Sequence, residues 1–344
     1  MQYKCQLKNT HKFMHFNYYL GVDVSKETLD AAIYPCKDRK ADFLHISNDT
    51  KGLNEMVKWL RSRKVKTVEL LICAEHTGVY TNNLISFTDK KSIAFCLESP
   101  LAIKKSLGIA RGKNDIVDAF RIAEYAYTYR EKLKLYQKPS ETIVQLQHLL
   151  TERRQYVKQR TSLLAIKSEL GKYDIAKTKA RRDTALRRLQ KIIEEIESQM
   201  KSIIAEDADV KHNYDLVSSV MGIGLINAVS TIVYTKNFHS FDTPRQYACY
   251  IGVAPFDNTS GTSIKGQTRV SPLCRSQQKS ELSMAARSAI MNDPWIRKYY
   301  QRKMKEKGGA RNMHGIVLNA VKFKLIMRMF AVVKSGEQYK VLNY

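Results

Sequence analysis

The chain has 344 residues, 44% of them hydrophobic, and a formal net charge of +25 from 58 Lys and Arg against 33 Asp and Glu. This length suggests two domains, or two with a connector, and the hydrophobic content excludes a wholly disordered chain. No run approaches about eighteen apolar residues, and residues 1–16 lack the apolar core of a secretion signal. We therefore expect a cytoplasmic protein with no membrane partner.

Residues 17–140 predict a domain of alternating strands and helices, after an N-terminal extension of residues 1–16. Apolar or alternating runs at 18–24, 28–34 and 43–46 predict three strands in a meander. Leu53, Met56, Val57 and Leu60 then recur at helical spacing, and two buried runs, 67–74 and 93–97, predict two further strands. Strands that come first in a meander and then alternate with helices indicate a mixed α/β sheet.

Residues 141–207 predict two long helices that break near residues 171–174. The segment is dense in Arg, Lys, Glu and Gln, and its apolar residues recur on one face of each half. This pattern is typical of a helical coiled-coil connector. We interpret most of its charges as solvated, so that it serves as a spacer or a partner surface.

Residues 208–344 predict a mainly α-helical C-terminal domain with a loop-rich centre. Gly222 and Gly224 precede an apolar helix, where close helix packing explains them better than phosphate binding. The polar, glycine-punctuated stretch 251–266 is expected to be a loop, and a basic run follows at 297–311. Residues 261–344 hold 17 Lys and Arg against 4 Asp and Glu. Such a surface indicates a polyanionic partner, most simply nucleic acid.

Four acidic residues stand where they can meet. Asp23 and Glu75 end two apolar strand runs, and Asp115 and Asp118 are three apart at the start of a predicted helix, on one face. Each has a structural alternative as a turn, cap or loop residue. Together, in a basic chain, they predict a site for hard divalent cations, which prefer oxygen ligands and assist phosphoryl displacement.

A family resemblance rests on these motifs. Tyr-Leu-Gly-Val-Asp-Val-Ser-Lys-Glu-Thr-Leu-Asp at 19–30, Glu75 with Thr77-Gly78, and Lys113-Asn114-Asp115 with Asp118-Ala119 resemble the RuvC-like DEDD domain of insertion-sequence transposases. The family is the IS110 family, related to the Piv DNA invertase. Gly222-Ile223-Gly224, Gly252-Val253-Ala254-Pro255 and Ser260-Gly261 resemble its second domain. The implied fold is a RuvC-like (RNase H-like) α/β domain at 17–140, the connector at 141–207 and a transposase domain at 208–344.

The resemblance implies a DNA recombinase with a composite active site. Asp23, Glu75, Asp115 and Asp118 would be catalytic and would bind Mg²⁺ (or Mn²⁺), while Ser260 would be the nucleophile on DNA. It further implies donor and target DNA, a guide (bridge) RNA and a homo-oligomer, a dimer that forms a tetramer on DNA, as partners. The candidate nucleic-acid contacts are Lys113, Gly261, Lys265, Arg269, Arg297, Lys298, Arg302, Lys303 and Lys305.

Two other interpretations remain open. In a RuvC-like nuclease that uses water as its nucleophile, the acids would be essential and Ser260 a mere turn residue. In a nucleic-acid-binding remnant without catalysis, replacing Asp23 or Glu75 would leave binding unchanged. A covalent bond between protein and DNA distinguishes the recombinase from both.

Overall fold

The chain divides into two compact units, residues 1–138 and 139–344. The computed structural model describes residues 16–36, 42–106, 115–260, 264–270, 276–308 and 313–340. For residues 172, 257–260, 264–269 and 276 the description is confined to the backbone. No helix in these described ranges is long and apolar enough to cross a membrane.

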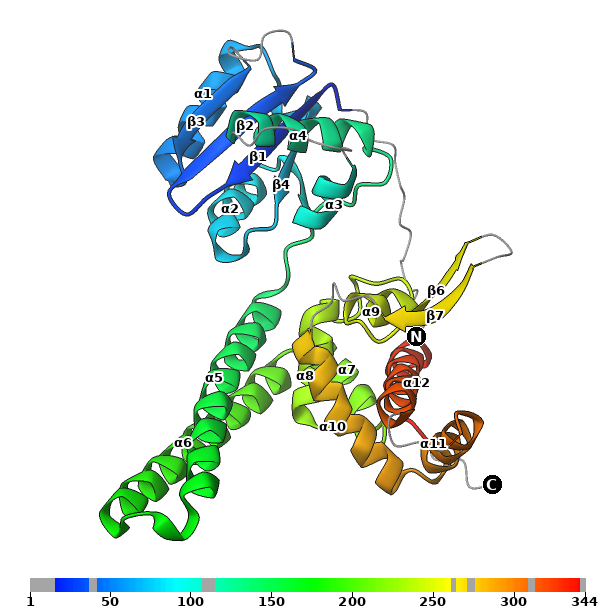
Figure 1. Ribbon diagram of the computed structural model, residues 1–344. Coiled ribbons are helices and arrows are strands. Elements are labelled where there is room, and N and C mark those ends of the chain that lie inside the picture. Colours follow the sequence, from blue (N-terminus) through cyan, green and yellow to red (C-terminus); the bar gives the residue numbers. More distant parts are fainter. Residues whose placement is uncertain are drawn as a thin grey trace. The chain divides into compact units, whose positions relative to one another are not determined.

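The first unit is built on a five-stranded mixed sheet of order β3-β2-β1-β4-β5 (Figure 1). β1 and β2 pair antiparallel, as do β2 and β3, whereas β4 runs parallel to β1 and β5 parallel to β4. The strands are β1 (Tyr18–Val24), β2 (Thr28–Tyr34), β3 (Phe43–Ser47), β4 (Leu70–Glu75) and β5 (Ala94–Glu98). The mixed sheet predicted from the sequence is therefore confirmed. The run predicted as a strand from residue 67 begins instead with a 3₁₀ turn, Thr67–Glu69.

Helices cover both faces of this sheet, because residues alternate between its two sides. Leu20 and Val22 of β1 pack with Met56 of α1 (Thr50–Ser62) and Leu84 of α2 (Asn82–Lys90). The opposite face, with Tyr19, packs against α3 and α4. The elements on that side are α3 (Pro100–Ser106) and α4 (Asp115–Thr128), and a 3₁₀ turn, Gly78–Thr81, precedes α2.

The second unit opens with a long antiparallel helical hairpin, as the sequence predicts. α5 (Glu141–Leu170) and α6 (Ala176–Glu206) are joined by a 3₁₀ turn, Gly171–Tyr173. At the turn, Nη1 and Nη2 of Arg182 donate to the two carboxylate oxygens of Asp174, at 2.7 and 2.8 Å. At the base, an apolar cluster joins the start of α5 and the end of α6 to α7 and α8.

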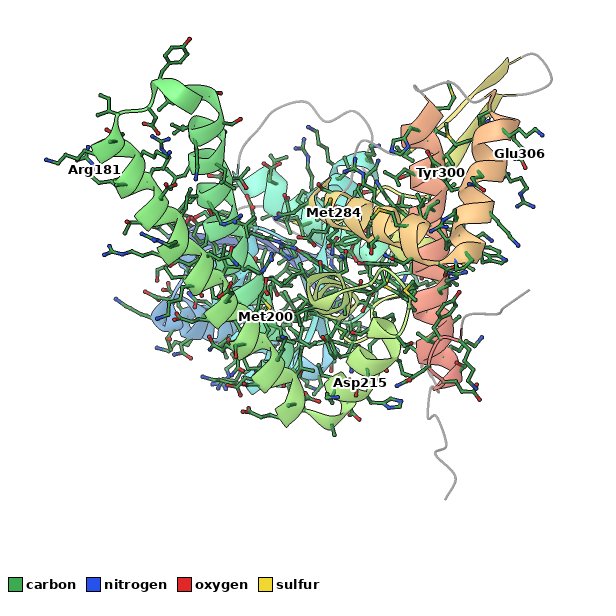
Figure 2. All side chains as sticks on the ribbon, turned by 90° about the horizontal axis from the view of Figure 1, so that it is seen from below. Arg181, Met200, Asp215, Met284, Tyr300 and Glu306 are labelled. Carbon is green, nitrogen blue, oxygen red and sulfur yellow. The ribbon has the colours of Figure 1, made fainter. Side chains whose placement is uncertain are left out.

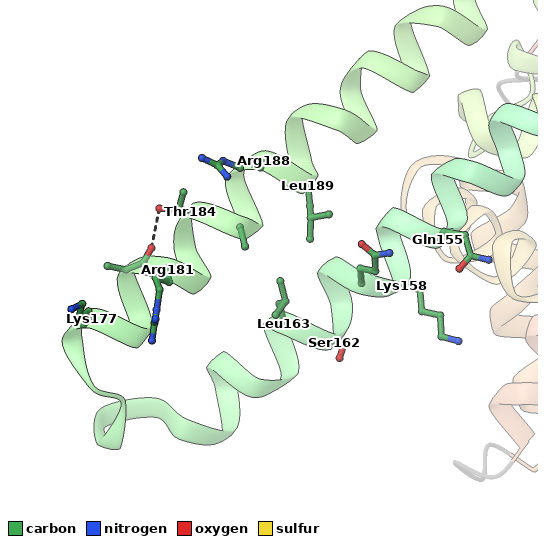
Figure 3. Close-up of a pocket in the computed structure, with 12 residues that line it drawn as sticks. Gln155, Lys158, Ser162, Leu163, Lys177, Arg181, Thr184, Arg188 and Leu189 are labelled. Atoms are coloured by element: carbon green, nitrogen blue, oxygen red, sulfur yellow. Dashed lines mark hydrogen bonds between the residues drawn. The ribbon is translucent and has the colours of Figure 1, made fainter.

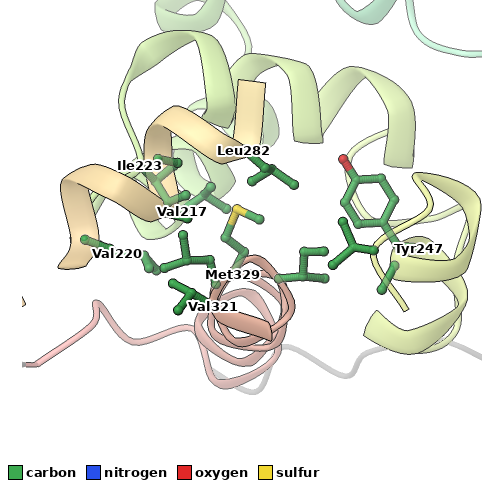
Figure 4. Packing of buried hydrophobic residues seen from close by; sticks show 14 of the residues in the cluster. Val217, Val220, Ile223, Tyr247, Leu282, Val321 and Met329 are labelled. Atoms are coloured by element: carbon green, nitrogen blue, oxygen red, sulfur yellow. The ribbon is translucent and has the colours of Figure 1, made fainter. Parts of the chain in front are cut away.

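The rest of the unit is mainly helical and encloses one apolar cluster. In Figure 4, Met329 lies beside Val217, Val220 and Ile223 on one side and Tyr247 on the other. The elements are α7 (Ala208–Ser218), α8 (Leu225–Thr235), α9 (Pro244–Tyr250), β6 (Pro255–Ser260), β7 (Ile264–Val270), α10 (Ser276–Asn292), α11 (Pro294–Glu306) and α12 (His314–Ser335). A side chain at Gly222, whose φ is +93°, would collide with Ala285 and Ala289 of α10, so the packing interpretation of this glycine holds.

The expectation of a loop is wrong for residues 255–260 and 264–266, which lie in strands. β6 and β7 pair antiparallel as a separate two-stranded sheet, and Ser260 is the last residue of β6 (Figure 1). The segment lacks the apolar alternation by which strands are recognised, because neither strand belongs to the main sheet.

Candidate active site

The acidic site of the first unit depends on a close contact between α4 and β1. A Cβ atom built on Gly21 would overlap the backbone of Ala119 and Ala123 in α4. With hydrogen as its side chain, Gly21 lets this helix rest directly on the strand. The contact fixes the start of α4, which carries Asp115 and Asp118, against the strand that carries Asp23.

Asp23 and Glu75 stand at the carboxyl ends of adjacent parallel strands. Val22 of β1 is in register with Ala74 of β4, and each acid follows by one residue. Asp23 shares its side of β1 with Tyr19 and Gly21, which face α4, since every second residue points the same way. The helix and the two strand ends thus direct all four predicted acids toward one edge of the sheet.

The four acids interact electrostatically. Burial raises the pKa of Asp23 above its ordinary value, and the charges of Asp118, Asp30 and Asp115 raise it further, against a hydrogen bond from the Val24 backbone. Burial also raises the pKa of Glu75, with contributions from Asp23 and Asp118. These shifts mark a site in which negative charges are held together at a cost, a common feature of functional sites.

The donors suit a hard divalent cation, because carboxylate oxygens are the ligands that such a cation prefers and its charge would offset the repulsion on Asp23 and Glu75. Among the residues the structure describes, no three side chains of His, Cys, Asp or Glu stand close enough together to hold a metal ion. The Oδ1 of Asp118 instead accepts from Nη1 of Arg121 at 2.9 Å. This cation shares the carboxylate that the sequence assigns to metal.

Two further acids lie beside this edge and were not predicted from the sequence. Asp30 is directly opposite Asp23 in register, is 6% exposed, and its Oδ1 lies 2.7 Å from Nδ1 of His45. Glu98 is opposite Glu75 at the end of β5, and the hydroxyl of Tyr125 donates to it at 3.4 Å. Burial raises the pKa of Glu98. The signal for Glu98 was the same as for Glu75, an acid that ends an apolar strand.

The predicted serine and its neighbours belong to the second unit. The backbone of Ser260 ends β6, opposite Ile264 of β7. Lys265 and Arg269 lie in β7, where only the backbone is described. Gly261 and, in the first unit, Lys113 lie outside the described residues.

The five predicted cations of α11 differ in their surroundings. Arg297 donates through Nε to the carbonyl of Ile290 at 3.1 Å, so it also closes the end of α10. Lys303 and Arg302 both pair with Glu306, at 2.6 and 3.6 Å. Lys298 and Lys305 are exposed. Figure 2 shows Glu306 on α11, and Tyr300 of the same helix, whose hydroxyl lies 2.8 Å from Nδ1 of His314.

A groove of about 1120 Å³ lies between α5 and α6, toward the turn of the hairpin (Figure 3). Leu163 and Leu189 face one another across it. Its rim includes Lys158, Arg181 and Arg188. The connector is therefore more than a row of solvated charges, because its two helices line an open groove that is basic and partly apolar.

Comparison with known proteins places these features in a family. Residues 20–170 match a family model described as Transposase, of the DEDD type of IS110, and residues 214–301 match the model of the Transposase IS116/IS110/IS902 family. The pilin gene-inverting protein of Moraxella bovis is 26% identical over 330 residues, covering 93% of this chain and 97% of the relative. That of Moraxella lacunata is equally similar, also 26% identical over 330 residues with the same coverage of both chains.

A protein of insertion element IS110 from Streptomyces coelicolor is 30% identical over 126 residues, covering 36% of this chain and 30% of the relative. The RuvC structure of Thermus thermophilus aligns with 35% of this chain and 99% of its own, at 10% identity and a TM-score of 0.27. The fold is a mixed α/β domain, a helical connector and a mainly helical second part, as expected from the sequence. The chain belongs to the IS116/IS110/IS902 family of transposases, and its activity is DNA transposition or recombination.

Proposed function

We propose that this protein cuts and rejoins DNA as the recombinase of an insertion sequence, with Ser260 as the nucleophile. The observation that carries the proposal is that β1, β4 and the start of α4 direct four acids toward the same end of the first unit's sheet, where the charges of Asp115 and Asp118 act on Asp23. Asp23, Glu75, Asp115 and Asp118 would hold Mg²⁺ or Mn²⁺. Such a cation stabilises the charge that develops on phosphate oxygens during displacement.

The reaction is a transesterification. The Oγ of Ser260 forms a bond to phosphorus as the bond from phosphorus to one deoxyribose oxygen breaks. The serine hydroxyl gives up its proton, and the released sugar oxygen takes one up. The phosphoserine link retains the energy of the phosphodiester, so a second sugar hydroxyl can displace Ser260 and rejoin the DNA without a consumed cofactor.

The proposed partners follow from the family resemblance and the charge. Donor and target DNA are the substrates, a guide RNA directs them, and the chain acts as a homo-oligomer, a dimer that forms a tetramer on DNA. The formal charge of +25 supports a protein that neutralises many phosphates. We further propose that Lys113, Gly261, Lys265 and Arg269, together with the cations of α11, contact nucleic acid.

The test is to trap the covalent intermediate. Purified protein, RNA transcribed from the flanking DNA, magnesium and labelled donor and target duplexes are combined and then denatured. We expect labelled DNA bound covalently to the wild-type protein and to Ser263→Ala, the matched control, but not to Ser260→Ala. An adduct that persists in Ser260→Ala would place the nucleophile elsewhere. Cleavage without any adduct would establish a nuclease that uses water. If neither cleavage nor an adduct appears, the chain is a nucleic-acid-binding protein without catalysis.

A further inference from the structure

Two aromatic rings on α11 form a stacked pair at the surface of the second unit. The rings of Trp295 and Tyr299 lie 5.6 Å apart between centroids, at an interplanar angle of 3°. They are four residues apart, so they follow one another along the same face of the helix. Trp295 is 39% exposed, although a tryptophan gains more than most residues from burial. The exposed part of the Trp295 ring can therefore be reached by a ligand from solvent.

Cations surround this pair. Nζ of Lys324, on α12, lies 5.7 Å from the Trp295 ring and 5.5 Å from the Tyr299 ring. The guanidinium of Arg302 lies 5.7 Å from Tyr299 on the other side along the helix. No ion pair joins Lys324 to a carboxylate among the described residues, so its charge is available to an anionic ligand.

The pair is held rigidly in place. Buried Asp293 caps α11 by accepting from the backbone nitrogens of Trp295 and Ile296, at 2.9 and 3.0 Å. The same carboxylate accepts from Arg328 at 2.6 Å, and the Arg328 guanidinium lies 4.9 Å from the Trp295 ring. Because Trp295 is fixed at both its backbone and its ring, a ligand that stacks on it need not order it first.

We infer that Trp295, Tyr299 and Lys324 form a binding site for an unpaired nucleotide, whose base stacks on Trp295 and whose phosphate pairs with Lys324. The inference deepens the proposed function and rests on it for the nature of the partner. A peptide partner is disfavoured because α11 carries five cations and one acid. Aromatic rings among cations are the usual platform for single strands, whereas a duplex keeps its base faces covered.

The protein contains its own reporter for this site. Its two tryptophans are Trp59 and Trp295, so Trp59→Phe leaves the emission of Trp295 alone. Single-stranded DNA, RNA of the same sequence and the matching duplex are each titrated into this variant, with binding followed independently by the anisotropy of labelled oligonucleotides. We expect saturable quenching by at least one single strand and none by the duplex. The DNA and RNA arms identify which strand supplies the nucleotide.

Variants test the stacking itself. Trp295→Leu should weaken single-strand binding by about 5- to 150-fold, the effect of losing one stacked base, and leave duplex binding unchanged. The control is Tyr173→Leu, which removes an aromatic ring that is 80% exposed, and should change neither. Lys324→Gln should retain quenching but lower the salt dependence of single-strand affinity by about 0.7 in log–log slope.

Several outcomes overturn the inference. These are binding of single strands without quenching, equal quenching by duplex, or equal losses of single-strand and duplex affinity in Trp295→Leu. Trp295→Phe, which keeps a ring, covers the case in which Trp295→Leu fails to fold, and should give an intermediate affinity. The Ser260 adduct separates the two proposals: an adduct without quenching refutes only this site, and quenching without an adduct refutes only the recombinase mechanism.

Discussion

At Gly21 one missing methyl group decides how near a helix comes to a strand. The backbone of α4 lies where a Cβ atom of any other residue would be. Asp23 lies two residues further along the strand, and Asp118 immediately precedes Ala119 in the helix. The distance between the acids of β1 and those of α4 is therefore set mainly by the backbone contact at Gly21, and less by interactions of the acidic side chains.

Replacement of Gly21 by alanine should disturb both the fold and the acidic edge. We expect Gly21→Ala to lower the free energy of unfolding by about 1–3 kcal/mol, the usual cost of overpacking, because the backbone of α4 must move away. Thermal or denaturant unfolding measures it. Gly315→Ala is the matched control: that helical position has open space, so the variant should be as stable as the wild type or slightly more so. A Gly21→Ala protein as stable as wild type would contradict the close contact.

The raised pKa values of Asp23 and Glu75 determine whether the free energy of unfolding rises or falls with pH at this site. Because their folded-state pKa values exceed the unfolded ones, the folded, metal-free protein binds more protons in the range between them. Lowering the pH from neutral through that range should therefore favour folding at this site, and raising it should do the reverse.

Asp23→Asn should accordingly stabilise the metal-free protein at neutral pH and flatten this pH dependence, while recombination falls at least about 100-fold. Magnesium should raise the melting temperature of the wild type more than that of the variant, because the variant has one ligand fewer. Thermal melts over a pH series, with and without magnesium, give both results. An equal response of the two proteins to magnesium would remove Asp23 from the proposed metal site.

At the scale of elements, the sequence predicted the strands and helices whose apolar residues recur at strand or helical spacing because they pack on a large core. Asp23 and Glu75 could be placed because apolar strand runs end at them, and Asp115 and Asp118 because helical spacing puts them on one face. The β6–β7 hairpin could not, because its residues around Asn258 and Gly266 show no apolar alternation. The contact between Asp30 and His45 was not predicted for a different reason. It depends on the register between two strands, which the sequence of one strand does not contain.

Some cations of α11 are paired with an acid and others are exposed, and this difference bears on how their neutralisation would affect DNA binding. Glu306 already pairs with Arg302 and Lys303, whereas Lys305 is exposed. An ion pair on an exposed helix contributes little free energy. Arg302 and Lys303 can therefore leave Glu306 and pair with a phosphate instead.

The triple variant Arg302→Gln, Lys303→Gln and Lys305→Gln should bind duplex DNA more weakly and with a log–log salt slope reduced by roughly 1–3, since each phosphate that is no longer neutralised lowers the slope by about 0.9. Affinities measured over a range of salt concentrations give the slope. Glu306→Gln serves as the opposite control and should bind at least as tightly as wild type. An unchanged slope in the triple variant would assign these charges to the solvated face of the helix.

At the scale of the whole molecule, the proposed catalytic groups are divided between two units: the acids before residue 138, Ser260 after it. A divided set of groups suits an oligomer, because one chain can supply acids to a serine of another. Asp23→Asn and Ser260→Ala should then each be inactive alone and partly active when mixed and allowed to exchange subunits. The recombination assay measures this. Mixed oligomers without any recovery would mean that each chain supplies its own acids and serine.

The α5–α6 hairpin has a consequence for how members of this family can diverge. Its helices of 30 and 31 residues extend roughly 45 Å out and back, and both ends are fixed in one apolar cluster at the base. The family models stop at residue 170 and resume at 214, so the returning helix lies between the matched segments. Seven residues added to each helix would preserve their packing and lengthen the arm by about 10 Å. The length of the α5–α6 hairpin can thus change without any substitution in the apolar cluster at its base.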